Sequence, residues 1–439
     1  MERPSASSVL NRSLFSDTAI PEMTLSNGAR IVMLQTQIRA DVVVMRVRSP
    51  GGWSIVPAED VAEAQYAGSI AQLSGVGGID QVSLERALSD QVAFAVPFVS
   101  EVHEGIFGEA SGEDLETLFQ LVNLYMTRAQ FEEGARDLVV SEQLQTARNA
   151  HLSPNLAVSS ALAEARYSGD DRFAPRPSVE DFETFDLARA EEIYRERFGN
   201  PGDFVYVFVG DFDFDELEDL ARRYIGSIPS GGDAEGFTDT RPDPPAGLVQ
   251  SVVEAGTGEL GRVTLLFSSE VTLDPELRVD IALLELVVQQ RLTDRIREEL
   301  SASYSPFASV GLIEEPVDSV EFTISVSADL ADLDAVALAA LGEIEALRDD
   351  GPTEDELFIA QQQLLRDYEL FSNEGLAAEI LFYAEHPDEM LTEIRIQNRG
   401  ARVLEATRSD LRAVARLLLP ADRYIDVRFV PIGFELEAA

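Results

Sequence analysis

The sequence predicts an α+β protein of two duplicated domains, each a largely antiparallel mixed sheet with helices packed on one face. The first observation is an internal repeat, because a helix, a Pro-containing turn and a strand at residues 188–209 recur in that order at residues 411–430. The second is that strand and helix patterns are mixed within each half. The third is that residues 91–110 indicate two strands joined by a short turn, which requires antiparallel pairing.

The repeat also sets the domain boundaries. A chain of 439 residues is long enough for two or more domains, each with its own core. Residues 231–246 are rich in Gly, Pro and Asp, which is typical of an exposed linker. We therefore place the first domain at residues 17–230 and the second at residues 247–439.

Strands are predicted where β-branched and aromatic residues cluster, and helices where apolar residues recur at steps of three and four. In the first half the expected strands are 29–35, 41–48, 91–99, 104–110 and 204–212, and the expected helices lie near 58–75, 112–130, 132–150 and 186–198. In the second half the expected strands are 262–268, 303–313, 320–328 and 424–431, and the expected helices lie near 275–300, 331–349, 354–386 and 408–418.

The helix near residues 275–300 has the clearest signals. Asp274 is a good N-cap, Pro275 suits the first turn, and Glu276 complements the positive end of the helix dipole. Its predicted core face consists of Leu277, Ile281, Leu284, Val288, Leu292 and Ile296. Arg297 lies just off this face in the last turn, and Tyr304 enters the next strand.

Arg297 and Tyr304 are the candidate substrate-binding residues. An Arg side chain offers only donors and a Tyr offers a hydroxyl, so the pair could grip a peptide backbone at a helix–strand junction. In the alternative interpretation, Arg297 caps the helix C-terminus and Tyr304 belongs to the core. Spacing alone favours this alternative.

The wider context of the pair resembles a known family. Arg297-Glu-Glu-Leu-x-x-x-Tyr304-Ser after a long buried helix is similar to the second-domain signature of the pitrilysin/insulinase family of zinc peptidases. Residues 25–32, 194–212 and 224–229 are also similar, so the resemblance covers roughly residues 17–432. It is closest to the C-terminal halves of long bacterial members. One departure is Ser301, where the family usually has Gly.

The resemblance implies that Arg297 and Tyr304 bind substrate, and that two such domain pairs close around a chamber. It also exposes a missing motif, since the catalytic half of the family carries His-x-x-Glu-His on a helix. The three His of this chain are His103, His151 and His386, no two of them within a helical turn, and there is no Cys. We expect no metal on this chain and zinc on a partner half. A site assembled from distant His and carboxylates is the minor alternative.

Two classes of function remain. In the first, the chain is a non-catalytic half or subunit of an insulinase-like zinc metalloendopeptidase, inactive alone and paired with a zinc-bearing half. In the second, it is a catalytically silent scaffold or assembly subunit with no role in peptide chemistry. Retention of both Arg297 and Tyr304 favours the first class. A stand-alone enzyme has no constellation of residues to support it.

Four weaker features have structural interpretations that we favour. His103-Glu104 could form a ligand pair, but we expect a surface His. The acidic run at 211–216 lacks the Gly and closing Glu of an EF-hand, so we expect Asp213 to cap a helix rather than bind calcium. Residues 74–78 lack the Lys of a phosphate loop and indicate a turn. Trp53 is expected to be packed.

The charge balance argues against several partners. The chain has 79 acidic and 34 basic residues, all of the basic ones Arg, and a net charge of −45. Nucleic acids and anionic membranes require basic patches. No apolar run is long enough to span a membrane, and residues 1–10 lack the features of a signal peptide. We expect the periplasm or cell envelope if the chain is half of a secreted precursor, and the cytoplasm otherwise.

Two explanations of the acidity remain: a surface adapted to high salt, as in a halophile, or an acidic chamber that collects basic peptides. Acidic residues occur in almost every predicted helix, and this spread favours the halophilic surface.

Dilution of salt is therefore expected to destabilise the protein. Exposed carboxylates repel one another over about 10 Å at 0.1 M salt and about 3 Å at 1 M. We expect the melting temperature to rise steeply between low and molar KCl. Thermal melts at several concentrations test this, and a flat curve would remove the halophilic interpretation and favour the acidic chamber.

Overall fold

The computed structural model describes residues 3–175, 178–232, 235–299, 306–369, 372–386 and 399–434. The chain divides into two compact units, and each of them combines separate stretches of sequence. The first unit contains Met1–Leu144, Glu180–Thr238 and Leu370–Gln397, and the second contains Gln145–Val179, Asp239–Glu369 and Asn398–Ala439.

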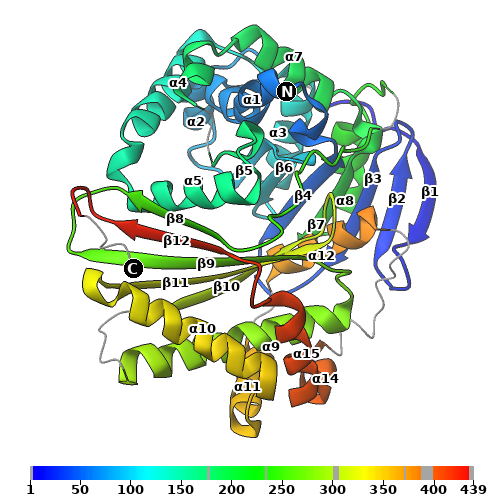
Figure 1. The fold of residues 1–439 in the computed structure, drawn as a ribbon. Coiled ribbons are helices and arrows are strands. Elements are labelled where there is room, and N and C mark those ends of the chain that lie inside the picture. Colours follow the sequence, from blue (N-terminus) through cyan, green and yellow to red (C-terminus); the bar gives the residue numbers. More distant parts are fainter. Residues whose placement is uncertain are drawn as a thin grey trace. The chain divides into compact units, whose positions relative to one another are not determined.

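The first unit is built on a seven-stranded sheet with the strand order β1-β2-β3-β7-β4-β6-β5 (Figure 1). The strands are β1 (Val9–Leu14), β2 (Pro21–Leu25), β3 (Arg30–Gln35), β4 (Val43–Pro50), β5 (Ala93–Val99), β6 (His103–Ala110) and β7 (Val205–Gly210). All neighbouring strands are antiparallel except β3 and β7. The predicted hairpin at residues 91–110 is confirmed as the β5–β6 pair.

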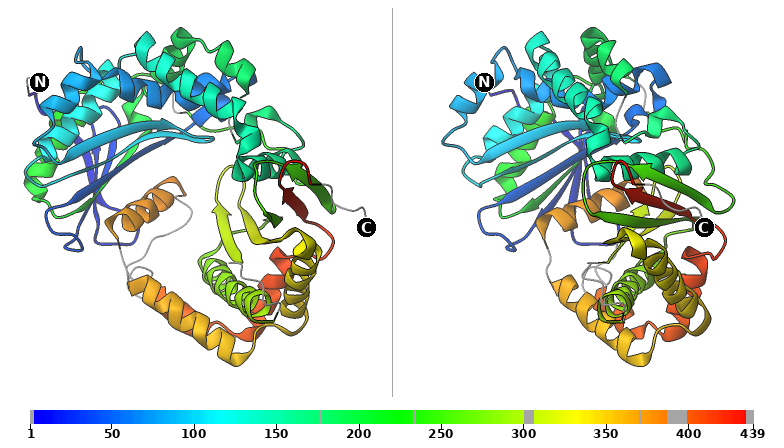
Figure 2. Two further views of the ribbon diagram at one scale, coloured as in Figure 1. Left: turned by 90° about the vertical axis from the view of Figure 1, so that its left-hand side faces the viewer. Right: turned by 60° about the vertical axis from the view of Figure 1, so that its left-hand side comes forward.

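Helices cover both faces of this sheet. The helices from the first half of the sequence are α1 (Val61–Ser74), α2 (Gln81–Ala87), α3 (Leu115–Arg128), α4 (Glu133–Arg148), α6 (Val179–Glu183), α7 (Leu187–Arg197) and α8 (Phe214–Leu220). Helix α1 packs on β5, and α3 packs on β5 and β6. Figure 2 shows α12 (Asn373–Glu385), in orange, on the opposite face, where it contacts β7 and β4.

The second unit is built on a five-stranded sheet with the order β10-β11-β9-β12-β8. The strands are β8 (Val249–Glu254), β9 (Leu260–Glu270), β10 (Phe307–Ile313), β11 (Ser319–Asp329) and β12 (Ile425–Val430). Only β12 and β8 are parallel. One face carries the helices α9 (Pro275–Leu292), α10 (Leu333–Asp350) and α15 (Arg408–Leu418). Two further helices, α11 (Glu354–Glu369) and α14 (Arg399–Glu405), pack against α9 and against each other. The other face carries α5 (Pro154–Arg166).

Each sheet thus receives one helix from the other half of the sequence. Helix α12 buries Leu376 and Ile380 in a cluster with Val207 of the first sheet. Helix α5 buries Val158 in a cluster with Val427 of the second sheet. The predicted fold class is confirmed, and these two helices add a covering layer that the sequence patterns did not indicate.

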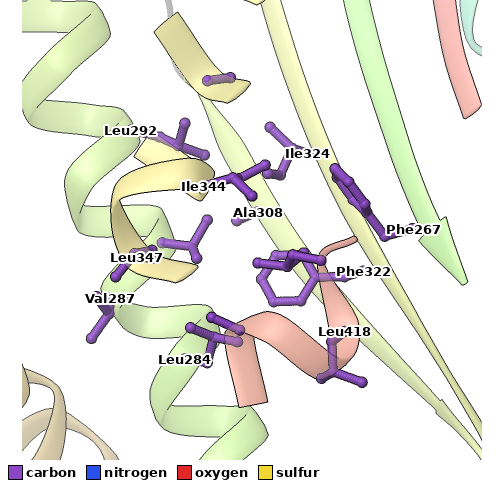
Figure 3. Close-up of a cluster of buried hydrophobic side chains, with 14 of the residues drawn as sticks. Phe267, Leu284, Val287, Leu292, Ala308, Phe322, Ile324, Ile344, Leu347 and Leu418 are labelled. Atoms are coloured by element: carbon purple, nitrogen blue, oxygen red, sulfur yellow. The ribbon is translucent and has the colours of Figure 1, made fainter. Parts of the chain in front are cut away.

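The core of the second unit lies between its sheet and α9, α10 and α15. In Figure 3, Leu284 and Leu292 of α9 point toward Phe322 and Ile324 of β11, and Val287 belongs to the same buried cluster. Of the predicted core face of α9, all but Leu277 are fully or almost fully buried. The 3.6-residue period of this helix therefore predicted its packing correctly.

Some predicted elements need correction. The single helix expected near residues 354–386 is two helices, because Ser372 is extended and its hydroxyl accepts a hydrogen bond from Gly375 N at 3.0 Å, which starts α12. Strands β1, β2 and β8 and helices α2, α5, α6 and α14 were not predicted. Five of the six residues of β1 are exposed, so this edge strand has no apolar alternation to detect. Among the described residues, no helix has both the length and the apolar character needed to cross a membrane.

The core of the second unit generates a stability prediction. Leu284 is 0% exposed, whereas Leu338 on α10 is 70% exposed. We expect Leu284→Ala to lower the free energy of unfolding by about 2.7–5 kcal/mol, because it leaves a cavity. The matched control Leu338→Ala should cost less than about 0.5 kcal/mol. Equal effects of the two substitutions in denaturant titrations would contradict this core.

Candidate functional site

The stretch that carries the two predicted site residues begins at α9. Asp274 caps this helix as predicted, accepting a hydrogen bond from Leu277 N at 2.8 Å. At Thr293 the helix changes to a π-helical turn, Thr293–Glu299, which contains the backbone of Arg297. The side chain of Arg297 and all of Tyr304 lie outside the described part of the structure. Such π-helical turns are rare and are often found at functional sites.

A glutamine side chain links α9 to the strand that follows the signature. Gln289 Nε2 donates to Pro306 O at 3.0 Å, and Gln289 Oε1 accepts from Ala308 N at 2.8 Å. Gln289 Nε2 also donates to Thr293 Oγ1 at 3.1 Å. One side chain therefore contacts both described ends of the stretch between the helix and β10. The sequence offered no signal for this role, since Gln290 is equally polar.

One helical turn earlier, Glu285 contacts the same strand. Its carboxylate accepts a hydrogen bond from the backbone of Val310. Burial raises the pKa of Glu285, and the hydrogen bond from Val310 counteracts part of this rise. Glu285 and Gln289 thus lie along one edge of β10.

Arg291 has a structural role. Its guanidinium donates to Glu356 Oε1 and Oε2 at 2.8 and 2.9 Å and to Gly351 O at 3.2 Å. Although burial acts to raise the pKa of Glu356, hydrogen bonds from Arg291 and Thr353 hold it below its usual value. The pair joins α9 to the start of α11 and supports the base of the signature.

In the first unit, α1 lies where a zinc motif would be expected. It contains no His, and its acidic residue Glu63 is 6% exposed. The carboxylate of Glu63 accepts a hydrogen bond from Asp186 N at 2.9 Å, directly before α7. Burial raises the pKa of Glu63. Glu63 therefore joins α1 to α7. Within each unit, the described His, Asp and Glu side chains form no group of three close enough to hold a metal ion.

The expectation of a surface His at position 103 was wrong. His103 and Glu104 leave β6 on opposite faces, as strand alternation requires, but both side chains are buried. His103 Nε2 lies 3.7 Å from Glu385 Oε2 of α12, and α12 comes from the distant end of the sequence. Helix α12 covers this face of the sheet, and the sequence around His103 gives no sign of a helix that comes from so far along the chain.

Glu104 is the most buried acidic residue of this region, with 0% exposure. Its Oε2 accepts a hydrogen bond from Gly52 N at 2.7 Å, and Arg197 lies nearby, paired with Glu235 at 2.8 Å. Burial raises the pKa of Glu104 to about 8, and the Gly52 hydrogen bond and the charge of Arg197 offset only part of this effect. At neutral pH the Glu104 carboxyl is therefore mostly protonated.

The remaining structural interpretations are confirmed. Asp213 caps α8 by accepting a hydrogen bond from Glu216 N at 3.0 Å. Trp53 is buried. The turn after α1 contains Gly75, Gly77 and Gly78, each with positive φ.

Glu104 gives a pH prediction. A Glu in the unfolded chain has a pKa of about 4.3, so between about 4.3 and 8 the folded state holds a proton that the unfolded state releases. The stability contributed by the protonated carboxyl is complete below pH 4.3 and is lost as the pH rises through 8. We expect Glu104→Gln to be more stable than the wild type at pH 9, with a smaller difference at pH 5.

Thermal melts between pH 5 and 9 measure this difference. The exposed control Glu405→Gln should show no such trend with pH. A Glu104→Gln variant that follows the wild-type curve throughout this range would refute the buried, protonated state of Glu104.

Comparisons with known proteins identify relatives of this chain. Residues 184–364 match the family model of the peptidase M16 inactive domain. The probable zinc protease PqqL of Haemophilus influenzae is 23% identical over 287 residues, which are 65% of this chain and 30% of PqqL. A zinc protease PQQL-like of Arabidopsis thaliana is 25% identical over 229 residues, which are 52% of this chain and 21% of that protein. The chain thus covers less than a third of the length of these relatives.

Solved structures share the fold. The periplasmic protease PqqL from Escherichia coli superposes with a TM-score of 0.83 at 18% identity, over 98% of this chain and 47% of PqqL. A peptidase M16 inactive domain from Pseudomonas fluorescens has a TM-score of 0.78 at 15% identity, over 95% of this chain and 100% of that domain. Together with the sequence signature and the missing His-x-x-Glu-His motif, the matches support the resemblance of this chain to the non-catalytic halves of the pitrilysin/insulinase family.

Proposed function

We propose that this chain is the non-catalytic half of an insulinase-like zinc metalloendopeptidase. It closes the peptide chamber and contacts the substrate through Arg297 and Tyr304. A zinc-bearing half, on a separate chain or on an N-terminal part of the same polypeptide, carries out hydrolysis. The chamber, the partner and its zinc are parts of this proposal.

The observation that carries the proposal is the supporting framework of the signature. Helix α9 is capped at Asp274, buried along one face and held by Arg291 at its end. Beyond Tyr304 the chain is held again where Gln289 contacts Pro306 and Ala308. Bonds on both sides of Arg297 and Tyr304 suit residues that need a defined position. A scaffold subunit would not require this pair.

The proposed chemistry divides between the two halves. Zinc on the partner half would supply an activated water for attack on the peptide bond. Arg297 and Tyr304 would donate hydrogen bonds to the substrate carbonyl and to the negative charge that develops on it.

The chain alone is expected to be inactive. After dialysis, metal analysis should find no stoichiometric zinc, because the sequence lacks paired His ligands. The purified chain should also leave fluorescein-labelled casein intact. One tightly bound zinc per chain, or cleavage that a chelator abolishes, would overturn the assignment as a non-catalytic half.

In complex with a co-expressed zinc-bearing half, Arg297→Ala and Tyr304→Phe should each lower casein turnover. Removal of a donor from an oxyanion-type site typically costs about 2.7–4 kcal/mol, a loss of roughly 100- to 1,000-fold in turnover. Zinc content and assembly should stay unchanged. Arg295→Ala is the matched control, because Arg295 lies in the same π-helical turn and is 41% exposed. Wild-type turnover from both site variants would favour the scaffold function.

A further inference from the structure

We infer that Gln289 is a positioning residue, whose side-chain amide takes the place of a neighbouring β-strand along the edge of β10. By doing so it holds the chain immediately before and after the Arg297–Tyr304 stretch. The structural part of this inference stands alone, and its consequence for turnover rests on the proposed function.

The first step concerns the edge of the sheet. Among the described strands, β10 is the outermost of the second sheet and has β11 as its one pairing partner. In a strand, the backbone groups of successive residues point to alternate sides. The N–H of Ala308 points away from β11, because Gln289 accepts its hydrogen bond. Pro306 O and Val310 N share that outward direction by the two-residue period.

The second step concerns the hydrogen bonds at this edge. A Gln amide has a carbonyl acceptor and an NH2 donor, as a backbone peptide group has an acceptor and a donor. Gln289 donates to Pro306 O and accepts from Ala308 N, which are the two groups that flank Phe307. A residue of an adjacent parallel strand would pair with the same two groups. Glu285 continues the row at Val310.

The third step concerns the helix end. Gln289 Nε2 carries two hydrogens, so it can donate to Thr293 Oγ1 as well as to Pro306 O. Thr293 Oγ1 in turn donates to Gln289 O at 2.8 Å. The first residue of the π-helical turn and the residue before β10 are thus bonded to one nitrogen. The stretch between them contains both proposed substrate-binding residues.

Two consequences follow. A misplacement of about 1 Å can cost roughly 100-fold in rate, so loss of these bonds should reduce turnover without removing any donor to the substrate. In addition, the outward groups of Pro306, Ala308 and Val310 are occupied, so this part of the edge is closed to strand addition by another chain.

Hydrogen exchange on the chain alone tests the structural part. Gln289→Met removes both strand bonds at similar volume, and the Ala308 amide should exchange several-fold faster, up to about tenfold. Gln289→Glu keeps the acceptor, so Ala308 should stay close to wild-type protection. The control is Gln290→Met, at a half-buried neighbouring Gln. Melting temperatures should first confirm that both variants are folded. If the Ala308 amide then exchanges at the same rate in Gln289→Met as in Gln290→Met, the inference is overturned.

Turnover of fluorescein-labelled casein by the complex with the zinc-bearing half tests the positioning role. We expect Gln289→Met to lower kcat by roughly tenfold or more with little change in KM, and Gln290→Met to have no effect. Unchanged kcat in Gln289→Met, where Arg297→Ala does lower kcat, would overturn the positioning role and leave the proposed function standing. If Arg297→Ala also has no effect, both fall.

Discussion

The requirement that both apolar faces of a sheet be covered determines the architecture of this protein. In the first sheet, Val205, Val207 and Val209 alternate with residues that face the other helical layer, and every residue of β7 is buried. Helix α12 supplies the second cover. In the second sheet α5 does the same over β12. Without these helices each sheet would expose a contiguous apolar face, which soluble domains avoid.

Polar contacts hold α12 on its sheet as well. Arg48 on β4 forms a two-point pair with Glu385, and Thr36 donates to Asn373 Oδ1 at 2.7 Å. Asn373 is itself fully buried. A planar guanidinium binds a carboxylate through two parallel hydrogen bonds. An Arg at this position therefore restricts the position of Glu385, the last residue of α12, more than a Lys would. The abundance of Arg and the absence of Lys in this acidic chain are consistent with such pairs.

The proposed substrate-binding stretch depends on the same kind of support. Helix α9 is held by burial along one face, by Arg291 at its end and by Asp280, which is paired with Arg402 of α14. β10 is then bonded to α9 through Glu285 and Gln289. The described residues on both sides of this stretch are thus held by packing and hydrogen bonds, which is the support that a precise binding site requires.

The sequence by itself determined most of the fold and the family. The buried face and the N-cap of α9, the hairpin β5–β6 and the cap at Asp213 are local patterns, set by residues within a few positions of one another. Arg297 and Tyr304 were found in the same way, from the sequence around them. Their role as substrate-binding residues stays a prediction.

The tertiary structure alone decided which long-range partners meet. It packed α12 on the sheet of the first sequence half and α5 on the sheet of the second. It also buried His103 under α12 and raised the pKa of Glu104 through desolvation. It also selected Gln289 rather than Gln290 as the residue bonded to β10. No local pattern encodes these contacts, because burial and hydrogen-bond partners depend on residues that are distant in the sequence. Glu385 and His103 come from opposite halves of the chain, Gly52 is 52 positions from Glu104, and Ala308 is 19 positions from Gln289.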